Sequence, residues 1–295
     1  MRRTVKVELG VTLCSSHELG MLDCALESIL PTTTHDVHTT LYLSTVTDEL
    51  LEGCLQIAEK YHINFEPRGD NSLTQYNNEL KHRAFDLDRA DCAMTIQPDT
   101  ILMRGDIFDS LLDRASEDFD TKYMVCISSN LVNDTSPLGM VIHTRLGWEQ
   151  VGCEDINFYP QAGSEHDCHR RSYISYGLDP EDTTTYLQPL AGQVTPPWVT
   201  RLRSQYFYHV GKPWHRDDPR LEPLPNIDYV SRVFFDCVLE DRWAPYYVEK
   251  WGDTGGHEMF LYPFNNEKYS MRIDFENCEN PYPEAKSVSL RGQII

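Results

Sequence analysis

The chain has 295 residues, of which 40% are hydrophobic and 24% charged, so it can bury a sizeable core and is not globally disordered. Its formal net charge of −20 at pH 7 disfavours nucleic acids and anionic membranes as partners, because both are negatively charged. No apolar run reaches the roughly 18 residues of a membrane span and the start has no apolar signal region, so we expect a cytoplasmic protein.

The nine cysteines are scattered through the chain, and no Cys-x-x-Cys pair occurs. Several of them lie inside apolar runs. This pattern favours buried, reduced thiols over a zinc cluster or a disulfide framework.

Strand and helix patterns alternate through the first hundred residues. Thr47-Asp48 is predicted to cap the second helix, and Pro31 to end the first. The alternation predicts an α/β domain with a mostly parallel sheet flanked by helices. Strands are predicted over 5–15, 37–46, 63–68 and 92–96, and helices over 17–30, 48–58 and part of 71–87.

The fourth predicted strand surfaces at the tetrapeptide "QPDT", Gln97 to Thr100. Open α/β sheets bind ligands at the carboxyl ends of their strands, so Asp99 is a candidate site residue. Pro-Asp is also ordinary turn chemistry, and a plain turn is the alternative. No Gly-x-Gly-x-x-Gly follows the first strand and no Gly-x-x-x-x-Gly-Lys occurs, which disfavours a Rossmann dehydrogenase and a P-loop enzyme.

The later chain has a less regular pattern. Another strand is predicted over 123–130 and a short helix over 145–151. Between residues 186 and 225, seven prolines stand among aromatic residues, which predicts an irregular, loop-rich segment. Helical periodicity returns over 226–252. We expect the polar tail after Phe264 to be peripheral or partly disordered.

Five segments, in this order, resemble the motifs of family 2 glycosyltransferases. "VTLCSSHELGMLDCALESIL" is similar to the opening strand, loop and helix, and "IQPDTILMRGDIFDSLL" to the "NPDT" metal motif of rhamnosyltransferase-like members. "DINFYPQAGSEHDCHRR" resembles the acceptor-site segment, "FYHVGKPWH" the "HxG" motif and "YYVEKWG" the C-terminal motif. The resemblance covers roughly residues 5 to 252 and implies a GT-A, Rossmann-like fold.

The resemblance implies a divalent metal, Mn²⁺ or Mg²⁺, between two ligands. Asp99 would supply a carboxylate and His209 an imidazole, and such a metal stabilises a leaving diphosphate. The alternative for His209 is a buried histidine packed among its aromatic neighbours. The family often has three acidic residues at its metal motif, whereas this chain has Gln97 and Pro98 before Asp99. Weak or partial metal dependence is therefore expected.

Donor recognition is expected from polar residues at the carboxyl ends of the strands, at the start of the third helix and near His209. The nucleobase stays open among UDP-, GDP- and dTDP-sugars, because the usual Asp after the second strand is absent. Two of the candidates, Asn71 and Asn78, could instead cap a helix. The donor-binding candidates are Thr12, Ser15, Thr45, Asn71, Asn78, Gln97 and Lys212.

An inverting transfer needs a general base that deprotonates the acceptor hydroxyl. The resemblance offers Glu165 and Asp167 for this role. Strict alignment favours Glu165, whereas an extended segment would favour Asp167, because its two neighbours would both turn inward. The alternative for either residue is an acidic loop paired with Arg170 or Arg171.

The sequence therefore predicts an inverting, metal-assisted glycosyltransferase that uses a nucleotide-sugar donor and a glycan or glycoprotein acceptor. Residues 1–215 would form the catalytic GT-A domain, and residues 216–295 a helical and loop-rich extension packed on it. Two alternatives stay open: a sugar-phosphate nucleotidyltransferase, and a degenerate GT-A domain that binds glycans without catalysis.

Overall fold

The structure, a computed structural model, describes most of the chain up to residue 253. Its described part has gaps, and the side chains of residues 129, 164–166, 208, 209 and 244 lie outside it. The described residues are 3–13, 18–43, 47–68, 73–129, 139–155, 164–177, 196–209 and 244–253.

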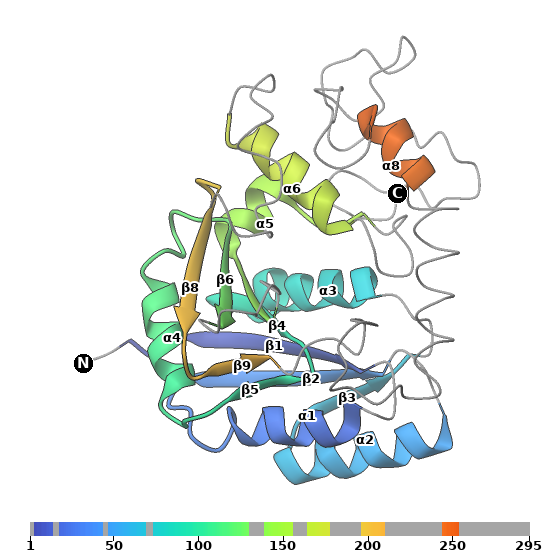
Figure 1. The fold of residues 1–295 in the computed structure, drawn as a ribbon, viewed down its shortest axis with the longest axis vertical. Coiled ribbons are helices and arrows are strands. Elements are labelled where there is room, and N and C mark those ends of the chain that lie inside the picture. Colours follow the sequence, from blue (N-terminus) through green and yellow to red (C-terminus); the bar gives the residue numbers. More distant parts are fainter. Residues whose placement is uncertain are drawn as a thin grey trace, which may run out of the picture.

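A seven-stranded sheet forms the centre of the molecule (Figure 1). Its order is β3-β2-β1-β4-β7-β6-β8, and only β7 runs antiparallel to its neighbours. This mostly parallel sheet with flanking helices confirms the predicted α/β class and matches the GT-A, Rossmann-like fold. The strands are β1 (Lys6–Leu13), β2 (Asp36–Leu43), β3 (Asn64–Pro67), β4 (Cys92–Ile96), β6 (Met124–Ser129), β7 (Met140–Thr144) and β8 (Val199–Ser204).

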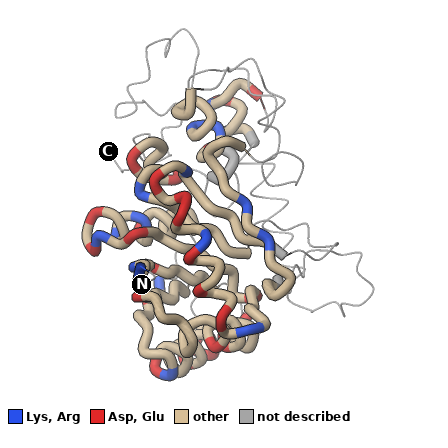
Figure 2. Tube along the Cα trace, turned by 90° about the vertical axis from the view of Figure 1, so that its left-hand side faces the viewer, with Lys and Arg blue, Asp and Glu red and all other residues tan. Residues whose placement is uncertain are grey.

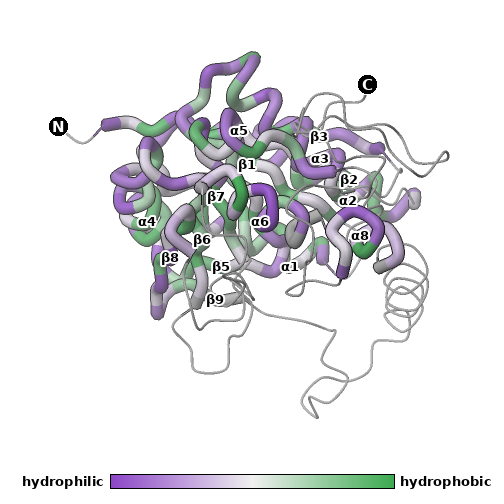
Figure 3. The backbone as a smooth tube through the Cα atoms, turned by 90° about the horizontal axis from the view of Figure 1, so that it is seen from above, coloured by the Kyte–Doolittle hydropathy of each residue, from purple (hydrophilic) through white to green (hydrophobic). Residues whose placement is uncertain are grey.

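Helices cover both faces of the sheet. In Figure 1, α1 and α2 lie below it and α3 lies above it, between the sheet and α6. Seen from above, the hydrophobic stretches lie mostly on the strands and the inner helix faces (Figure 3). The helices are α1 (Glu18–Glu27), α2 (Asp48–Tyr61), α3 (Leu73–His82) with the π-helical turn η1 (Arg83–Leu87), α4 (Ile107–Ser116), α5 (Arg145–Val151), α6 (Ser164–Ser175) and α8 (Ala244–Trp251).

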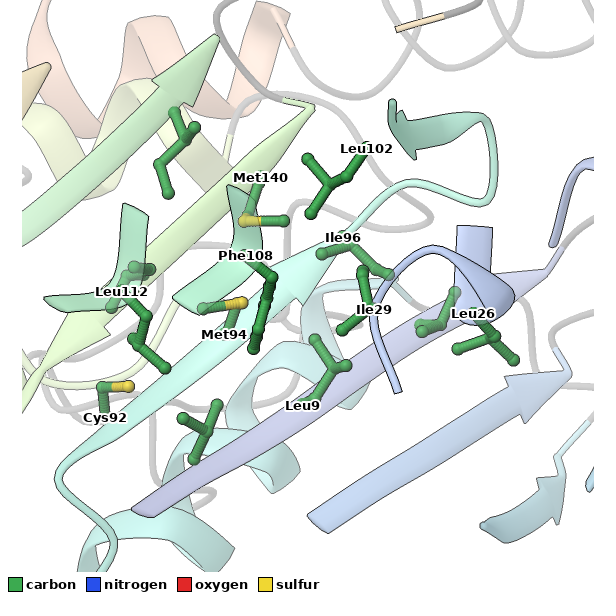
Figure 4. Packing of buried hydrophobic residues seen from close by; sticks show 14 of the residues in the cluster. Leu9, Leu26, Ile29, Cys92, Met94, Ile96, Leu102, Phe108, Leu112 and Met140 are labelled. Carbon is green, nitrogen blue, oxygen red and sulfur yellow. The ribbon is translucent and has the colours of Figure 1, made fainter. Parts of the chain in front are cut away.

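The main core lies between the sheet and helices α1, α2 and α4. Residues alternate along β1, so that Leu9 and its odd-numbered neighbours face this core. In Figure 4, Leu9, Met94 and Ile96 of the sheet pack near Ile29 and Phe108 of the covering segments. This burial is the main stabilising term of the fold, at roughly 25 cal/mol per Å² of apolar surface.

Local signals explain where several elements begin and end. The Thr47 hydroxyl accepts a hydrogen bond from the Leu50 amide (3.3 Å), so the predicted cap of α2 is confirmed. The helix ends at Tyr61 and is capped by His62, whose φ of 55° is left-handed. Strand β4 and helix α5 have the predicted bounds.

Several elements differ from the sequence prediction. Residues 164–175 form the helix α6, not an extended or looped segment. The region that we predicted to be irregular contains β8 and the short strand β9 (Phe207–His209). Strand β7 had no counterpart in the prediction; it pairs with β6, the strand before it in the chain, and with the more distant β4.

Charged residues are spread along the described trace, and acidic residues occur on many elements (Figure 2). This distribution fits a solvated, solubilising acidic surface. Within the described residues, no helix combines the length and apolarity needed to cross a bilayer.

We predict that Gly147→Ala destabilises the protein, because a Cβ at this position would lie 2.3 Å from the backbone oxygen of Tyr123. The backbone oxygen cannot move away without shifting the chain at Tyr123, so we expect a loss of about 1–3 kcal/mol in the free energy of unfolding, measured by urea denaturation. Gly20→Ala is the matched control, since Gly20 is an exposed position of helix α1 with open space around it and its substitution should raise stability. Equal unfolding midpoints for the two variants would contradict the close contact at Gly147.

Candidate functional site

Three parallel strands end together at one edge of the sheet. Thr12 of β1 pairs with Tyr42 of β2, and Val11 pairs with Ile96 of β4. Thr12 and Gln97 therefore lie at neighbouring strand ends. This is the edge at which open α/β sheets bind ligands.

The chain turns sharply after β4. The Thr100 amide donates a hydrogen bond to the Gln97 carbonyl (3.0 Å), which closes a turn with Pro98 and Asp99 at its centre. The turn alternative is thus observed, and it holds Asp99, half-buried, just beyond the strand end. Gln97 is tied to the sheet through its backbone N–H, which donates a hydrogen bond to the carbonyl of Gly139 (3.2 Å).

A second, two-stranded sheet brings the distant C-terminal half of the chain to this turn. Strand β5 (Thr100–Leu102) pairs antiparallel with β9, and Thr100 lies opposite His209. Opposite residues in such a pair have Cα atoms about 4.5–5.5 Å apart. The backbones of Asp99 and His209, the two predicted metal ligands, are therefore close neighbours.

Buried contacts fix this pairing. The Phe207 ring lies in the main core and contacts Gly139, where an added Cβ would be 2.7 Å from the ring. Thr100, fully buried, donates its hydroxyl to the Gly139 carbonyl (2.7 Å). Small size at Gly139 is thus a condition for the position of β9.

A buried polar cluster joins α3 to the segment after α5. Lys81 donates to the Glu154 carboxylate (2.7 Å) inside the protein. Asn78 donates to the Glu154 carbonyl and accepts from its amide, both at 2.7 Å. These bonds give Asn78, one of the donor-binding candidates, a structural task in the interior.

A second buried cluster joins α6 to α8. The Lys250 ammonium lies 2.6 Å from Asp155 and 2.7 Å from Asp167, and Arg171 pairs with Asp167 at 2.8 Å. The Trp251 indole also donates to Asp167 (2.8 Å). Asp167 is fully buried, so its carboxylate is held by three donors out of contact with solvent.

Electrostatics keep Asp167 ionised in this site. Burial alone would raise the pKa of its carboxyl group, but the charges of Lys250 and Arg171 outweigh burial and hold the pKa below its ordinary value of 3.8. The pKa of Lys250 is raised, because the two aspartates outweigh the effect of its burial. A buried carboxylate with a lowered pKa is a weak proton acceptor.

Some predicted site residues have a described backbone but no described side chain. Glu165 is the second residue of α6, and His209 is the last of β9. No group of three metal-binding side chains occurs among those that the structure describes. Four further donor-binding candidates lie outside the described residues: Ser15, Thr45, Asn71 and Lys212.

Sequence reasoning missed the buried ion pairs of Lys81, Glu154, Asp155 and Lys250. The sequence placed Lys250 only within the motif "YYVEKWG". In the structure Tyr246, Tyr247 and Trp251 beside it are buried. The available signal was the adjacent acidic pair Glu154-Asp155, together with a lysine between aromatic residues.

Comparisons with known proteins found similar structures but no sequence relative. The sequence matches no protein-family profile and no curated protein. S. aureus TarS is similar over 69% of this chain and 36% of its own, with 10% identity and a TM-score of 0.45. Glucosyl-3-phosphoglycerate synthase from Mycobacterium tuberculosis, in complex with Mn²⁺, UDP and glucosyl-3-phosphoglycerate, is similar over 81% of this chain and 80% of its own, with 13% identity and a TM-score of 0.46.

Two further structures are similar to a comparable degree. A mannosyltransferase from Pyrobaculum calidifontis, in complex with GDP-Man and Mn²⁺, has 15% identity over 68% of this chain and 57% of its own, with a TM-score of 0.41. A cytidylyltransferase from Leptospira borgpetersenii has 13% identity over 69% of this chain and 77% of its own, with a TM-score of 0.42. Identities and scores this low carry no argument about activity, which we therefore take from the site.

We predict that Asp167→Asn lowers the free energy of unfolding by about 3–5 kcal/mol at pH 7, because Lys250 and Arg171 would lose a buried countercharge. The folded-state pKa of Asp167 is lowered, so its stabilisation is complete above the ordinary value of 3.8 and is lost as pH falls through the lowered pKa. The gap between variant and wild type should therefore narrow at low pH in urea denaturation. As a control, Asp23→Asn at a surface pair with Lys60 should lower the free energy of unfolding much less. A difference in free energy of unfolding between Asp167→Asn and wild type that stays constant with pH would contradict an ionised Asp167.

Proposed function

We propose that the protein is an inverting glycosyltransferase that moves a sugar, hexose or deoxyhexose, from a nucleotide-sugar to a hydroxyl group of a glycan or glycoprotein with the help of a divalent metal. The observation that carries the proposal is the pairing of β5 with β9. It makes the backbones of Asp99 and His209 close neighbours at the carboxyl edge of a mostly parallel sheet, which supports a shared site.

The residues at this edge suit a metal–diphosphate group. A carboxylate and an imidazole are ligands that Mn²⁺ accepts, and a carboxylate also suits Mg²⁺. When bound, such a metal would neutralise the charge that develops on the departing nucleoside diphosphate. Asp99 and His209 would hold it, and the turn closed between Gln97 and Thr100 would keep Asp99 at the strand end.

The donor would lie across the ends of β1, β2 and β4. Thr12 is partly exposed at the end of β1, and half-buried Gln97 follows β4. We propose these two as donor contacts, with Ser15, Thr45, Asn71 and Lys212 as further donor contacts proposed from the sequence. UDP-, GDP- and dTDP-sugars remain the candidate donors.

We propose Glu165 as the general base and give Asp167 a positioning role. Successive helical residues are rotated by about 100°, so positions 165 and 167 lie on nearly opposite sides of α6. Asp167 faces the buried cations, where its lowered pKa makes it a poor base. Position 165, in the first turn, is the one turned away from them.

We predict that Asp99→Ala removes Mn²⁺-dependent binding of nucleoside diphosphates and leaves the fold intact, because Asp99 lies beyond the strand end. Isothermal titration with UDP and GDP, with and without Mn²⁺, measures this, and circular dichroism checks the fold. Asp106→Ala, an exposed aspartate in the segment after β5, should bind like wild type. Unchanged Mn²⁺-dependent affinity in Asp99→Ala would remove Asp99 from the site.

We predict that Glu165→Gln lowers kcat by about 10²–10⁴-fold and leaves donor affinity unchanged, because the base acts on the acceptor hydroxyl. The assay follows release of nucleoside diphosphate from a panel of nucleotide-sugars. Glu149→Gln, at an exposed glutamate of α5, serves as the control. Normal turnover in Glu165→Gln would refute Glu165 as the base. Release of pyrophosphate when the protein is given a nucleoside triphosphate and a sugar phosphate would indicate a nucleotidyltransferase instead.

A further inference from the structure

Helix α8 holds α6 through a charged contact inside the protein. Lys250, 3% exposed, lies within 2.7 Å of the Asp167 carboxylate on α6. Trp251 adds an indole N–H bond to the same carboxylate (2.8 Å), and its ring centroid lies 5.8 Å from the Arg170 guanidinium. Two consecutive residues of α8 thus contact Asp167 and Arg170 of α6.

The same helix is also tied to the chain before α6. Asp155 accepts hydrogen bonds from Lys250 (2.6 Å) and from the Tyr246 hydroxyl (2.7 Å). Arg171 donates to the carbonyls of Val151 and Cys153, at the end of α5. The cluster therefore has an outer frame, formed by α8 and the segment after α5, around one carboxylate of α6.

Charge balance makes the cluster a rigid unit. Two carboxylates, Asp155 and Asp167, face two cations, Lys250 and Arg171, and all four side chains are buried. Removing one partner of a buried pair leaves an uncompensated charge, so partial arrangements are strongly disfavoured. A shift of α6 relative to α8 would break these bonds together.

We propose that Lys250 and Trp251 are positioning residues. By binding Asp167 they fix the first turn of α6, and thereby the position of the general base at residue 165. The inference rests on the proposed function. Catalysis is sensitive to such placement, since a misplacement of about 1 Å can cost about 10²-fold in rate. The C-terminal helix would then set the acceptor side without touching a substrate.

The deciding variant is Trp251→Phe, which deletes one N–H donor to Asp167 and keeps an aromatic ring. We expect kcat to fall at least about tenfold, because Asp167 loses one of its three donors and the first turn of α6 can shift, while donor affinity changes less than about twofold. The matched control is Trp148→Phe on α5, which deletes the same kind of bond, to Asp86 (3.2 Å), at a contact with η1. Its kcat should stay near that of wild type.

A second readout does not depend on activity. Cys168 follows Asp167 on α6 and is 8% exposed, and burial raises the pKa of its thiol, so alkylation should be slow. In Trp251→Phe we expect at least about tenfold faster labelling of Cys168, read by peptide mass spectrometry, because the first turns of α6 loosen. Cys126, 2% exposed in the central sheet, should stay protected and shows that the fold persists.

Each outcome decides the proposal. Faster labelling of Cys168 with a lower kcat supports it, and Lys250→Met should act in the same direction more strongly. A normal kcat in Trp251→Phe overturns the positioning role, even if Cys168 is labelled faster than in wild type. If the wild-type protein releases no nucleoside diphosphate from any donor, the proposed function fails instead; labelling of Cys168 then still decides whether α8 anchors α6, and a wild-type labelling rate overturns that anchoring.

Discussion

The pairing of β5 with β9 is the constraint on which the candidate site depends. Only three residue pairs form it, from Thr100 opposite His209 to Leu102 opposite Phe207. Without it, the turn after β4 would carry one carboxylate and nothing from the C-terminal half of the chain. Backbone pairing of so few residues is marginal by itself, so its stability has to come from the core.

That core support is specific. Phe207 is fully buried against Gly139, and the Met103 amide extends the ladder by donating to the Tyr206 carbonyl (2.8 Å). Arg104 adds a cation–π contact 4.8 Å above the Tyr206 ring. The buried cluster around Lys250 performs a similar task on the other side of α3, where it joins α8 to α6. In both places, a segment late in the sequence is fixed to the sheet domain by a few buried side chains.

Local patterns predicted much of the fold and little of the side-chain pairing. Strand β4 was predicted to the residue because it is a continuous apolar run, and α5 because its cap and apolar spacing are local. Helix α6 was missed because its sequence, "SEHDCHRRSYIS", has no apolar stripe. Its Asp167 is buried against Arg171 of the same helix and against Lys250, which lies far along the chain. Asp99 was a candidate because of its place at a strand end, and the resemblance added its metal role and His209. The partners of Lys250, Asp155 and Asp167, lie more than 80 residues before it in the chain, so no local pattern indicates them.

The central claim is that Asp99 and His209 share one metal at the strand ends. A crystal structure with Mn²⁺ and UDP or GDP, recorded with anomalous diffraction at the manganese edge, tests it most directly. The account predicts an anomalous peak within about 2.0–2.3 Å of an Asp99 oxygen and a His209 nitrogen, in contact with the diphosphate. Nucleotide bound at the carboxyl edge with its Mn²⁺ held by other side chains would contradict the account.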